Sequence, residues 1–369
     1  SNPAEAIAAG FVAGAVMESR GAGAAAAAAA APLVSGADPV SLGIGAAAAL
    51  VSRRVWPVPP SDGAEARKVW PRGRAEPRSG GEGLFVAVNT ASGNGDSPAD
   101  ALRRELPRAE VEEVDLVDGD ELRKALDEGA EHATALGVSG GDGSINTAAQ
   151  VALENDSALA VFPSGTFNHL AGALAIEGAD DTFAAIEDGE AVAIDAATID
   201  GHVFLNTASF GAYAELVDMR ERLEHRLGKW PAVLVALVRV LRHSRPVAVE
   251  IDGRPRKVWM AFIGNCRYSP SGFAPSWRRR LDDEQIDFRC VDGSTPFART
   301  RLVLAVLTGR LGRCKVYEQR VVKELRIQSL EGPLRLARDG ETFMSSGDEV
   351  VVRKLPQRLA VYCPHEQVG

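Results

Sequence analysis

A glycine-rich stretch at residues 137–150, GVSGGDGSINTAAQ, holds the first residues whose types and spacing could do chemistry. Glycines let a backbone approach an anion closely, and the first N–H groups of a helix are unpaired and lie at its positive end. This pattern therefore favours a site for a phosphate chain. Asp142 within it indicates an accompanying cation, because a carboxylate that faces a phosphate otherwise costs energy. Taken alone, the stretch fits an ordinary glycine turn equally well.

Two further loops of small residues fall at equivalent places in the chain. Residues 89–93 follow the apolar run 84–88, and residues 163–166 follow the run 159–162. In a parallel sheet, ligands bind beyond the carboxyl ends of the strands. Three such loops at neighbouring strand ends make a nucleotide site a better interpretation than three unrelated turns.

A parallel sheet covered by helices would bring these loops together. Between residues 84 and 163, apolar runs of strand length alternate with helical patterns, which is typical of such a sheet. We expect strands at 84–88, 111–117, just before the glycine loop and at 159–162, with helices at 98–106, 120–132 and from the glycine loop to 153.

From about residue 191 the pattern changes to short alternating strands, which predicts a mostly antiparallel second domain. The apolar helix at 230–241 favours a buried core over a lipid groove, and Trp277 with the three arginines after it indicates a solvated loop or a contact with an anionic membrane. We expect strands at 203–207, 247–251, 257–263, 285–291, 322–329, 333–337, 349–352 and 359–362, and helices at 213–227, 230–241 and 296–308.

Composition limits the classes of protein that fit. The chain has 369 residues, of which 46% are hydrophobic and 25% charged, as in an ordinary soluble globular protein of about two domains. The net charge of −9 and the pI near 5.3 argue against a nucleic-acid partner, which normally meets a basic stripe. The four cysteines lack the spacing of a zinc site or a disulfide framework, so a reducing cytosol is expected.

The first 56 residues differ from the rest. They are rich in Ala and Gly, and their second apolar run, at 40–51, is closed by Arg53 and Arg54. Alanine and glycine drive insertion weakly, and this run is shorter than the roughly 20 residues of a span, so we expect a marginal membrane anchor with the rest of the chain in the cytosol. Residues 57–83 are rich in Pro, Gly, Arg and Glu, which predicts an exposed linker.

Five ordered motifs resemble those of the diacylglycerol kinase catalytic family, in particular the bacterial soluble lipid kinases. The resemblance covers residues 84–364, and five motifs in order are difficult to produce by chance. The motifs are VNTASG at 88–93, GGDGSIN at 140–146, PSGTFNHLA at 163–171, Asp195 with FLNTASFG at 204–211, and DGE at 339–341.

The resemblance implies two domains: an α/β nucleotide-binding domain like that of phosphofructokinases and NAD kinases, and a mostly antiparallel β-sandwich. ATP would lie in the cleft between them. The boundaries that follow are an Ala-rich helical segment at 1–56, a linker at 57–83, an ATP-binding domain at 84–195, a lipid-substrate domain at 196–338, and a catalytic turn with a return to the first domain at 339–369.

By the same resemblance the three loops contact the nucleotide, and Asp142 lies near Mg²⁺. The implied nucleotide-binding residues are Asn89, Ser92, Gly93, Gly140, Gly141, Asp142, Gly143, Ser144, Asn146, Gly165 and Thr166. A structural Mg²⁺ in the second domain is a further family feature, and Asp283 and the carbonyl of Gln285 occupy its place here. Glu284 stands where the family usually has glycine, so an acidic solvated turn is an equal alternative at this place.

The aspartate of the family's DGE motif is the proposed general base, which makes Asp339 the candidate here, with Glu341 orienting or assisting it. Phosphoryl transfer to an alcohol needs in-line positioning, neutralisation of charge on the γ-phosphate, and a group that takes the hydroxyl proton. Gly340 lets the chain reverse, so that Asp339 can project into a cleft. In isolation the pair would indicate only a hairpin turn, and the other four motifs decide for a catalytic role.

The N-terminal segment carries a second, fainter resemblance, to the last helices of type 2 phosphatidic acid phosphatases, which occur fused upstream of such kinases. It rests on SNP at 1–3, MES at 17–19 and SRRVWP at 52–57. The phosphatase PSGH motif would fall on PAEA at 3–6, and the later histidine is absent. We therefore expect a degenerate, inactive remnant.

These patterns predict an ATP- and Mg²⁺-dependent lipid kinase that phosphorylates the hydroxyl of a diacylglycerol-like lipid to a phosphatidic-acid-like product. The expected location is the cytoplasm, peripheral to or weakly anchored in the inner face of the cell membrane, with a lipid substrate at the membrane surface, no nucleic acid, and a homodimer left open. Two alternatives are a soluble-substrate kinase of the NAD kinase type and a membrane-tethered nucleotide- or lipid-binding module without turnover. The DGE segment and the apolar helices favour a lipid, and the presence of Asp142, Thr166 and Asp339 argues against a module without turnover.

Overall fold

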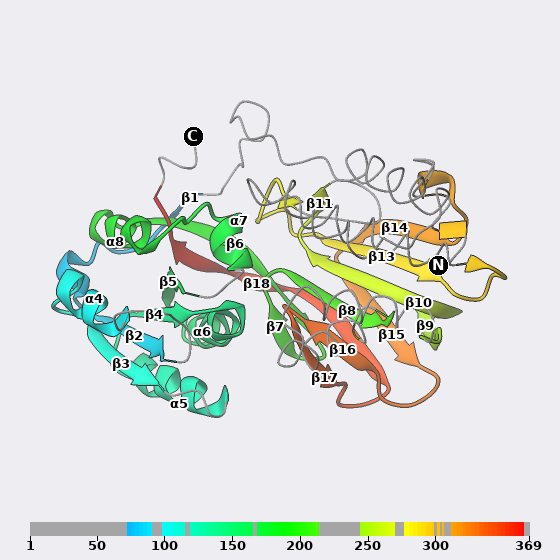
Figure 1. The fold of residues 1–369 in the computed structure, drawn as a ribbon, viewed down its shortest axis with the longest axis horizontal. Coiled ribbons are helices and arrows are strands. Elements are labelled where there is room, and N and C mark those ends of the chain that lie inside the picture. The colour runs from blue at the N-terminus through cyan, green and yellow to red at the C-terminus, as the bar shows by residue number, and fades with distance from the viewer. Residues whose placement is uncertain are drawn as a thin grey trace, which may run out of the picture.

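The computed structural model shows an α/β domain and a β-rich domain side by side, joined through one continuous sheet (Figure 1). It describes residues 72–90, 98–114, 119–164, 168–212, 244–269, 277–298 and 311–364, together with residues 214, 301, 302 and 305. The fold class predicted from the sequence is confirmed: an α/β domain precedes a mostly antiparallel one.

Four parallel strands form the centre of the α/β domain, in the spatial order β3, β2, β4, β5. The strands β2 and β4 are buried along their whole length, as continuous apolar runs require. The strands are β2 (Leu84–Asn89), β3 (Glu110–Val114), β4 (Ala135–Gly140) and β5 (Ala158–Pro163). The helices are α4 (Pro98–Glu105), α5 (Gly119–Ala130), α6 (Asp142–Glu154), α7 (His169–Ala173) and α8 (Ala179–Asp188).

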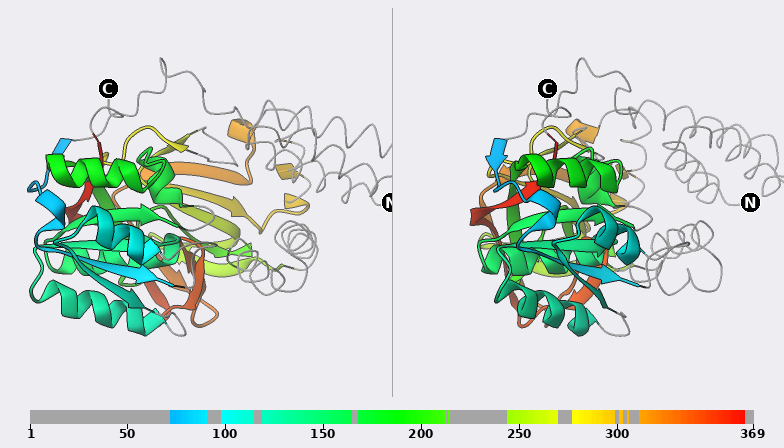
Figure 2. Two further views of the ribbon diagram at one scale, coloured as in Figure 1. Left: turned by 60° about the vertical axis from the view of Figure 1, so that its left-hand side comes forward. Right: turned by 90° about the vertical axis from the view of Figure 1, so that its left-hand side faces the viewer.

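Helices cover both faces of these strands, because successive side chains of a strand point to opposite faces (Figure 2). Phe85 and Leu136 belong to a core cluster that includes residues of α5 and α6. Their neighbours Leu84 and Ala135 belong to a second cluster, with residues of α4 and α8. The carboxyl ends of the strands are therefore left for loops.

The β-rich domain is antiparallel in all the strand pairs described within it, and two core clusters fill it. Residues as distant in sequence as Phe204 and Val352 share the first of these clusters, so the sheet curls around it. The strands are β7 (His202–Phe204), β8 (Thr207–Gly211), β9 (Val247–Ile251), β10 (Arg254–Asn265), β13 (Ile286–Asp292), β14 (Tyr317–Val322), β15 (Glu324–Ser329), β16 (Arg335–Arg338) and β17 (Glu341–Met344), with a separate pair β11 (Tyr268–Ser269) and β12 (Trp277–Arg278).

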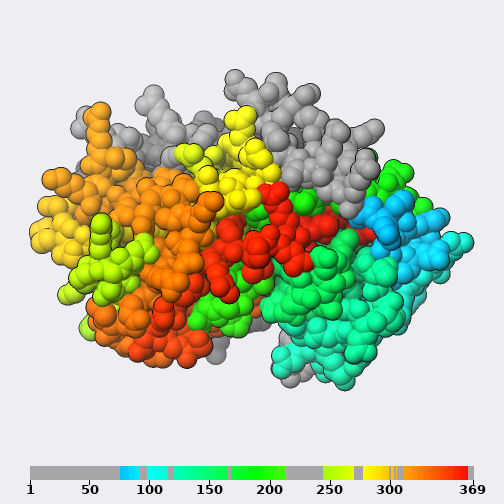
Figure 3. All heavy atoms as spheres, turned by 180° about the vertical axis from the view of Figure 1, so that it is seen from behind, coloured from blue at the N-terminus to red at the C-terminus, as the bar shows by residue number. Residues whose placement is uncertain are grey.

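Two long strands, β6 (Glu190–Ile199) and β18 (Glu349–Tyr362), pass from one domain into the other. They pair antiparallel with each other, and β18 also pairs with β15 at one end and with β5 at the other. Their register shifts between Lys354 and Arg358, at the crossing. The sequence predicted two separate strands here, whereas the structure has one continuous strand. In the space-filling view, residues at the C-terminal end of the colour scale bridge the two lobes (Figure 3).

Residues 72–83 belong to the folded body, which corrects the expectation of an exposed linker up to residue 83. The strand β1 (Arg72–Arg74) pairs with β6, and a short 3-10 helix, η2 (Ser79–Gly81), follows. The buried guanidinium of Arg78 donates to the hydroxyl of Tyr362 at 2.8 Å and to Thr134 Oγ1 at 2.7 Å. Backbone pairing at a sheet edge needs no apolar side chains, so a polar, Pro-rich composition did not reveal this strand.

Several expected elements lie outside the described residues. They are the segment 1–56 with its phosphatase resemblance, the helices at 213–227 and 230–241 apart from residue 214, and most of the helix at 296–308. Among the helices that the structure does describe, none combines the length and the apolar character needed to cross a membrane.

Candidate active site

The glycine-rich stretch lies where β4 ends and α6 begins, at the carboxyl edge of the parallel strands. Gly141 precedes the helix in an extended conformation. Gly140 is required by packing, because a Cβ there would lie 2.5 Å from the Cβ of Ser144. Asn89, at the end of β2, donates a 3.3 Å hydrogen bond to the Ser144 hydroxyl. Two of the three predicted loops thus meet at one sheet edge, beside the positive end of α6.

Gly140→Ala is expected to destabilise the fold and weaken nucleotide binding. The added methyl group would overlap the buried Ser144, so α6 must shift, and overpacking of this kind costs about 1–3 kcal/mol. We expect a lower unfolding midpoint and a loss of about tenfold in ATP affinity, the factor that 1.4 kcal/mol represents. Thermal unfolding and calorimetric titration with ATP measure both. Gly172→Ala is the control, because nothing lies within 4 Å of the added atom; equal ATP affinity in both variants would contradict the assignment of this loop.

Asp142 lies in the first turn of α6 and joins two loops. Its Oδ1 accepts a 2.7 Å hydrogen bond from the backbone N–H of His169, the first residue of α7. The side chain therefore ties the segment after β5 to the glycine loop. Within the part of the chain that the structure describes, its other oxygen has no hydrogen-bond or ion-pair partner, and the residue is half-buried. A free carboxylate oxygen at this position is a suitable ligand for a divalent cation.

Asp339 and Gly340 form the two-residue turn between β16 and β17, with φ values of 43° and 99°. The side chain of Asp339 points back to the loop that precedes β8. Its carboxylate accepts three backbone hydrogen bonds, from Leu205 at 2.7 Å on Oδ2 and from Asn206 at 2.9 Å and Thr207 at 2.7 Å on Oδ1. The DGE turn is thereby fastened to the FLNTASFG motif, so these two motifs are one structural unit.

Burial raises the pKa of Asp339 above its ordinary value, and the three backbone N–H groups oppose that rise because they favour the charged form. The residue as a whole is half-buried, while its carboxyl group is enclosed. Three N–H groups leave about one of the four lone-pair positions of a carboxylate unused, and it lies on Oδ2, which accepts a single N–H. This is a rigidly held carboxylate with a higher proton affinity than a solvated aspartate.

Arg278 holds the same loop from the other side, and the sequence did not single it out for that role. Its side chain is buried, and it donates to the carbonyl of Leu205 at 2.6 Å and to Oδ1 of Asn206 at 2.7 Å. The expectation of a solvated or membrane-facing loop is therefore wrong for Arg278, although Arg279 beside it is exposed. A run of arginines alone does not tell which member is buried, because the acceptors come from residues about 70 positions earlier.

Glu341 brings the DGE turn against the glycine loop. A Cβ at Gly143 would lie 2.7 Å from Glu341 Oε1, so this carboxylate of β17 lies at the first turn of α6. Its side chain is 54% exposed, and its Oε2 lies 3.7 Å from the guanidinium of Arg338. Residues about 200 positions apart thus face each other where the domains meet. Figure 3 shows the two lobes separated by an indentation at their lower edge.

Asp283 and Gln285 do not fit the structural Mg²⁺ site expected of them. The oxygens of Asp283 accept the backbone N–H groups of Arg267 at 2.8 Å and Gln285 at 2.9 Å, and the Gln285 carbonyl accepts the N–H of Cys266 at 2.9 Å. Burial raises the pKa of the neighbouring Cys266 thiol to about 12. Glu284 has φ of 55°, the left-handed region in which glycine is at ease, which accounts for the family's glycine at this place.

The structure therefore brings together part of the predicted site. The nucleotide-binding candidates that it places at the α6 end of the sheet are Asn89, Gly140, Gly141, Asp142, Gly143, Ser144 and Asn146, and the catalytic candidates Asp339 and Glu341 lie at the facing turn. Ser92, Gly93, Gly165 and Thr166 lie outside the described residues.

Comparison with known proteins finds relatives for this arrangement. Residues 83–199 match the family model of the diacylglycerol kinase catalytic domain. A Pseudomonas aeruginosa protein named "Probable lipid kinase YegS-like" is 27% identical over 293 residues, which cover 76% of this chain and 94% of that protein. The diacylglycerol kinase of Bacillus subtilis is 33% identical over 139 residues, 36% of this chain and 46% of that protein. A crystal structure of a diacylglycerol kinase from Bacillus anthracis shares the fold, with a TM-score of 0.53 and 17% identity over 77% of this chain and 98% of that one.

Proposed function

Because the chain belongs to the diacylglycerol kinase catalytic family and is a lipid kinase, we propose that it transfers the γ-phosphoryl group of ATP to the hydroxyl of a diacylglycerol-like lipid. The product would be a phosphatidic-acid-like lipid. The observation that carries the proposal is the contact of Glu341 with Gly143, because it sets the DGE turn against the glycine loop. A triphosphate on that loop would have its terminal phosphate beside the carboxylates of the second domain.

The glycine loop is suited to the triphosphate of ATP. The first N–H groups of α6 have no partner within the helix, and its dipole favours negative charge there. Asp142 would hold Mg²⁺ through the oxygen that the His169 N–H leaves free. When bound, Mg²⁺ would supply positive charge that offsets the negative charge of the phosphates during transfer. Asp142 and Glu341 at one helix end repel each other, which further favours a cation between them.

Asp339 is our candidate for the general base. The lipid hydroxyl oxygen would bond to the γ-phosphorus while the bond from that phosphorus to the bridging oxygen of ADP breaks. The hydroxyl proton would pass to the remaining lone pair of Asp339 Oδ2. The raised pKa of Asp339 suits this task, since it brings the proton affinity of the carboxylate closer to neutral pH. Glu341 would assist from the phosphate side.

The proposed substrate also defines where the protein works. A diacylglycerol-like lipid resides in a membrane and ATP in the cytoplasm, so the cleft would open toward the cytoplasmic membrane surface. This membrane association rests on the proposed substrate.

Transfer of labelled γ-phosphate tests the proposal. The purified full chain is incubated with labelled ATP and a panel of diacylglycerols and other lipid alcohols in mixed micelles, with NAD as a parallel acceptor. We expect labelled phospholipid and no labelled NADP. Labelled NADP alone would establish a soluble-substrate kinase, and ATP binding without any labelled product would indicate a module without turnover. Either result would overturn the proposal.

A further inference from the structure

Lys354 is a buried cation that the proposed reaction does not use. It lies on β18 where the pairing with β6 shifts register. Its side chain is 9% exposed, and its Nζ lies 3.1 Å from Asp195 Oδ2, 2.5 Å from Asn265 Oδ1 and 3.3 Å from Cys266 Sγ. An ammonium group has three N–H donors. Each of them has an acceptor here, so the group is held as a bound ion would be.

The partner carboxylate, Asp195, is fully compensated. Its side chain is 5% exposed, its Oδ2 also accepts the backbone N–H of Glu284 at 2.6 Å, and its Oδ1 accepts Nε of Arg358 at 3.0 Å. Arg358 in turn lies 3.1 Å from Glu284 Oε1. A carboxylate removed from water is strongly disfavoured unless it is paired and hydrogen-bonded. Two side-chain cations and one N–H group meet that requirement.

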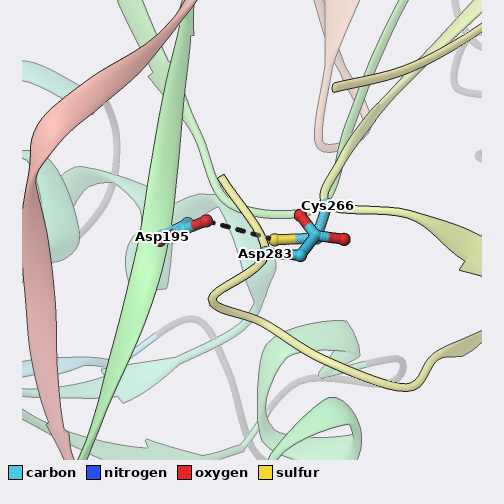
Figure 4. Close-up of side chains that lie close together, drawn as sticks. All are labelled: Asp195, Cys266 and Asp283. Atoms are coloured by element: carbon cyan, nitrogen blue, oxygen red, sulfur yellow. Dashed lines mark hydrogen bonds between the residues drawn. The ribbon is translucent and has the colours of Figure 1, made fainter. Parts of the chain in front are cut away.

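The same cluster contains residue types and spacings that could hold a metal ion. Ligand atoms of Asp195, Cys266 and Asp283 lie within 4.8 Å of one another (Figure 4). The Lys354 ammonium, however, is within 3.3 Å of ligand atoms from two of these three residues. A divalent ion bound there would lie beside a positive charge in a poorly solvated place, where charges of the same sign repel strongly. The ammonium and a metal ion therefore exclude each other.

We infer that the Lys354 ammonium takes the place of a metal ion at this cluster. The chain supplies its own cation to Asp195 and takes no divalent ion at this cluster. The carboxylate of Glu284 is paired with Arg358, and each oxygen of Asp283 already accepts one backbone N–H. Because β6 and β18 both contribute to the cluster, this internal cation also fixes the path of β18 between the domains.

Thermal unfolding of the nucleotide-free full chain tests this inference. Wild-type protein is expected to unfold at the same temperature in EDTA, Mg²⁺ or Ca²⁺. Lys354→Ala leaves the Asp195 carboxylate short of a cation, so its midpoint in EDTA should fall by on the order of 10 °C. Ca²⁺ or methylammonium should raise that midpoint again, because either can enter the vacated space. Arg353→Ala is the matched control. Arg353 is next to Lys354 on the same strand, but its side chain is exposed, so this variant should unfold at the same temperature as the wild type.

Binding of a divalent ion by the wild-type protein would contradict the inference. A wild-type midpoint that rises with Mg²⁺ or Ca²⁺, together with one divalent ion per chain that survives dialysis and is released by Asp283→Asn, would overturn the inference. An unchanged midpoint in Lys354→Ala would do the same. If Lys354→Ala fails to fold, Lys354→Arg retains the charge and is expected to fold and to ignore divalent ions. A requirement of Lys354→Arg for a metal would contradict an internal cation.

Discussion

Asp339→Asn is expected to lower kcat for lipid phosphorylation by about 10²-fold or more, the contribution typical of a general base. The KM for ATP should change little, because Asp339 contacts the loop at Leu205 to Thr207 and not the glycine loop. Steady-state kinetics with labelled ATP and diacylglycerol micelles measure both constants. A wild-type kcat in this variant would remove Asp339 from the mechanism.

The pH dependence separates a base from a purely structural carboxylate. A base must be deprotonated, so kcat/KM should rise with pH through the pKa of Asp339, and burial places this rise above the ordinary aspartate range. Activity is therefore lost as pH falls through the raised pKa. Asparagine does not titrate, so the rise should vanish in Asp339→Asn. It should persist in Glu341→Gln; if the two variants behave the other way round, Glu341 is the base.

Asp339→Asn also perturbs the fold, which the comparison must take into account. With the Asn oxygen facing Asn206 and Thr207, its NH₂ group would face the N–H of Leu205, donor against donor. A buried unsatisfied donor costs about 1–3 kcal/mol. Activities are therefore compared at equal concentrations of folded protein, as determined by denaturant unfolding.

Arg278→Met is expected to lower the free energy of unfolding by about 3 kcal/mol or more, since buried acceptors lose a charged donor. The variant retains side-chain length but leaves the carbonyls of Leu205 and Asn265 and the amide oxygen of Asn206 without this partner. The loop that holds Asp339 should loosen, so kcat should fall as well. Denaturant unfolding and the lipid kinase assay measure the two effects.

Arg279→Met is the matched control for this prediction. Arg279 is the next residue along the chain, and it is exposed. Its replacement should leave stability and kcat close to the wild type, because surface substitutions usually change stability by less than about 0.5 kcal/mol. Equal stabilities of the two variants would contradict the role given to Arg278.

The α/β domain could be predicted from the sequence because its strands are buried on both faces. The runs 84–88 and 159–162 are continuous and apolar, and they coincide with β2 and β5 to within one residue at each end. The strand β14, YEQRVV, was not predicted as a separate strand, because its residues are only partly buried and alternate weakly. The strand β1 was not predicted at all, since the sequence RGR carries no apolar pattern and depends on β6 for its structure.

The candidate site shows the same limit. Gly140 and Asp142 could be found from local spacing, since both act within one strand–turn–helix unit. Lys354 and Arg278 could not, because their acceptors lie 159 and 73 residues away in the chain, at Asp195 and Leu205. An isolated lysine or arginine in a sequence has the appearance of a solvated charge. For Lys354, the register of β18 against β6 shows that the ammonium is enclosed.

The order in which the two domains finish folding follows from the two strands that they share. The family match ends at residue 199, yet β5 finds its outer partner in β18, where Val361 lies opposite Leu159. A nascent chain released to residue 199 would hold the glycine loop but would leave that edge of the sheet unpaired and the place of Tyr362 in the core empty. The first domain to emerge from the ribosome therefore cannot complete its sheet until the C-terminal strand β18 has been synthesised.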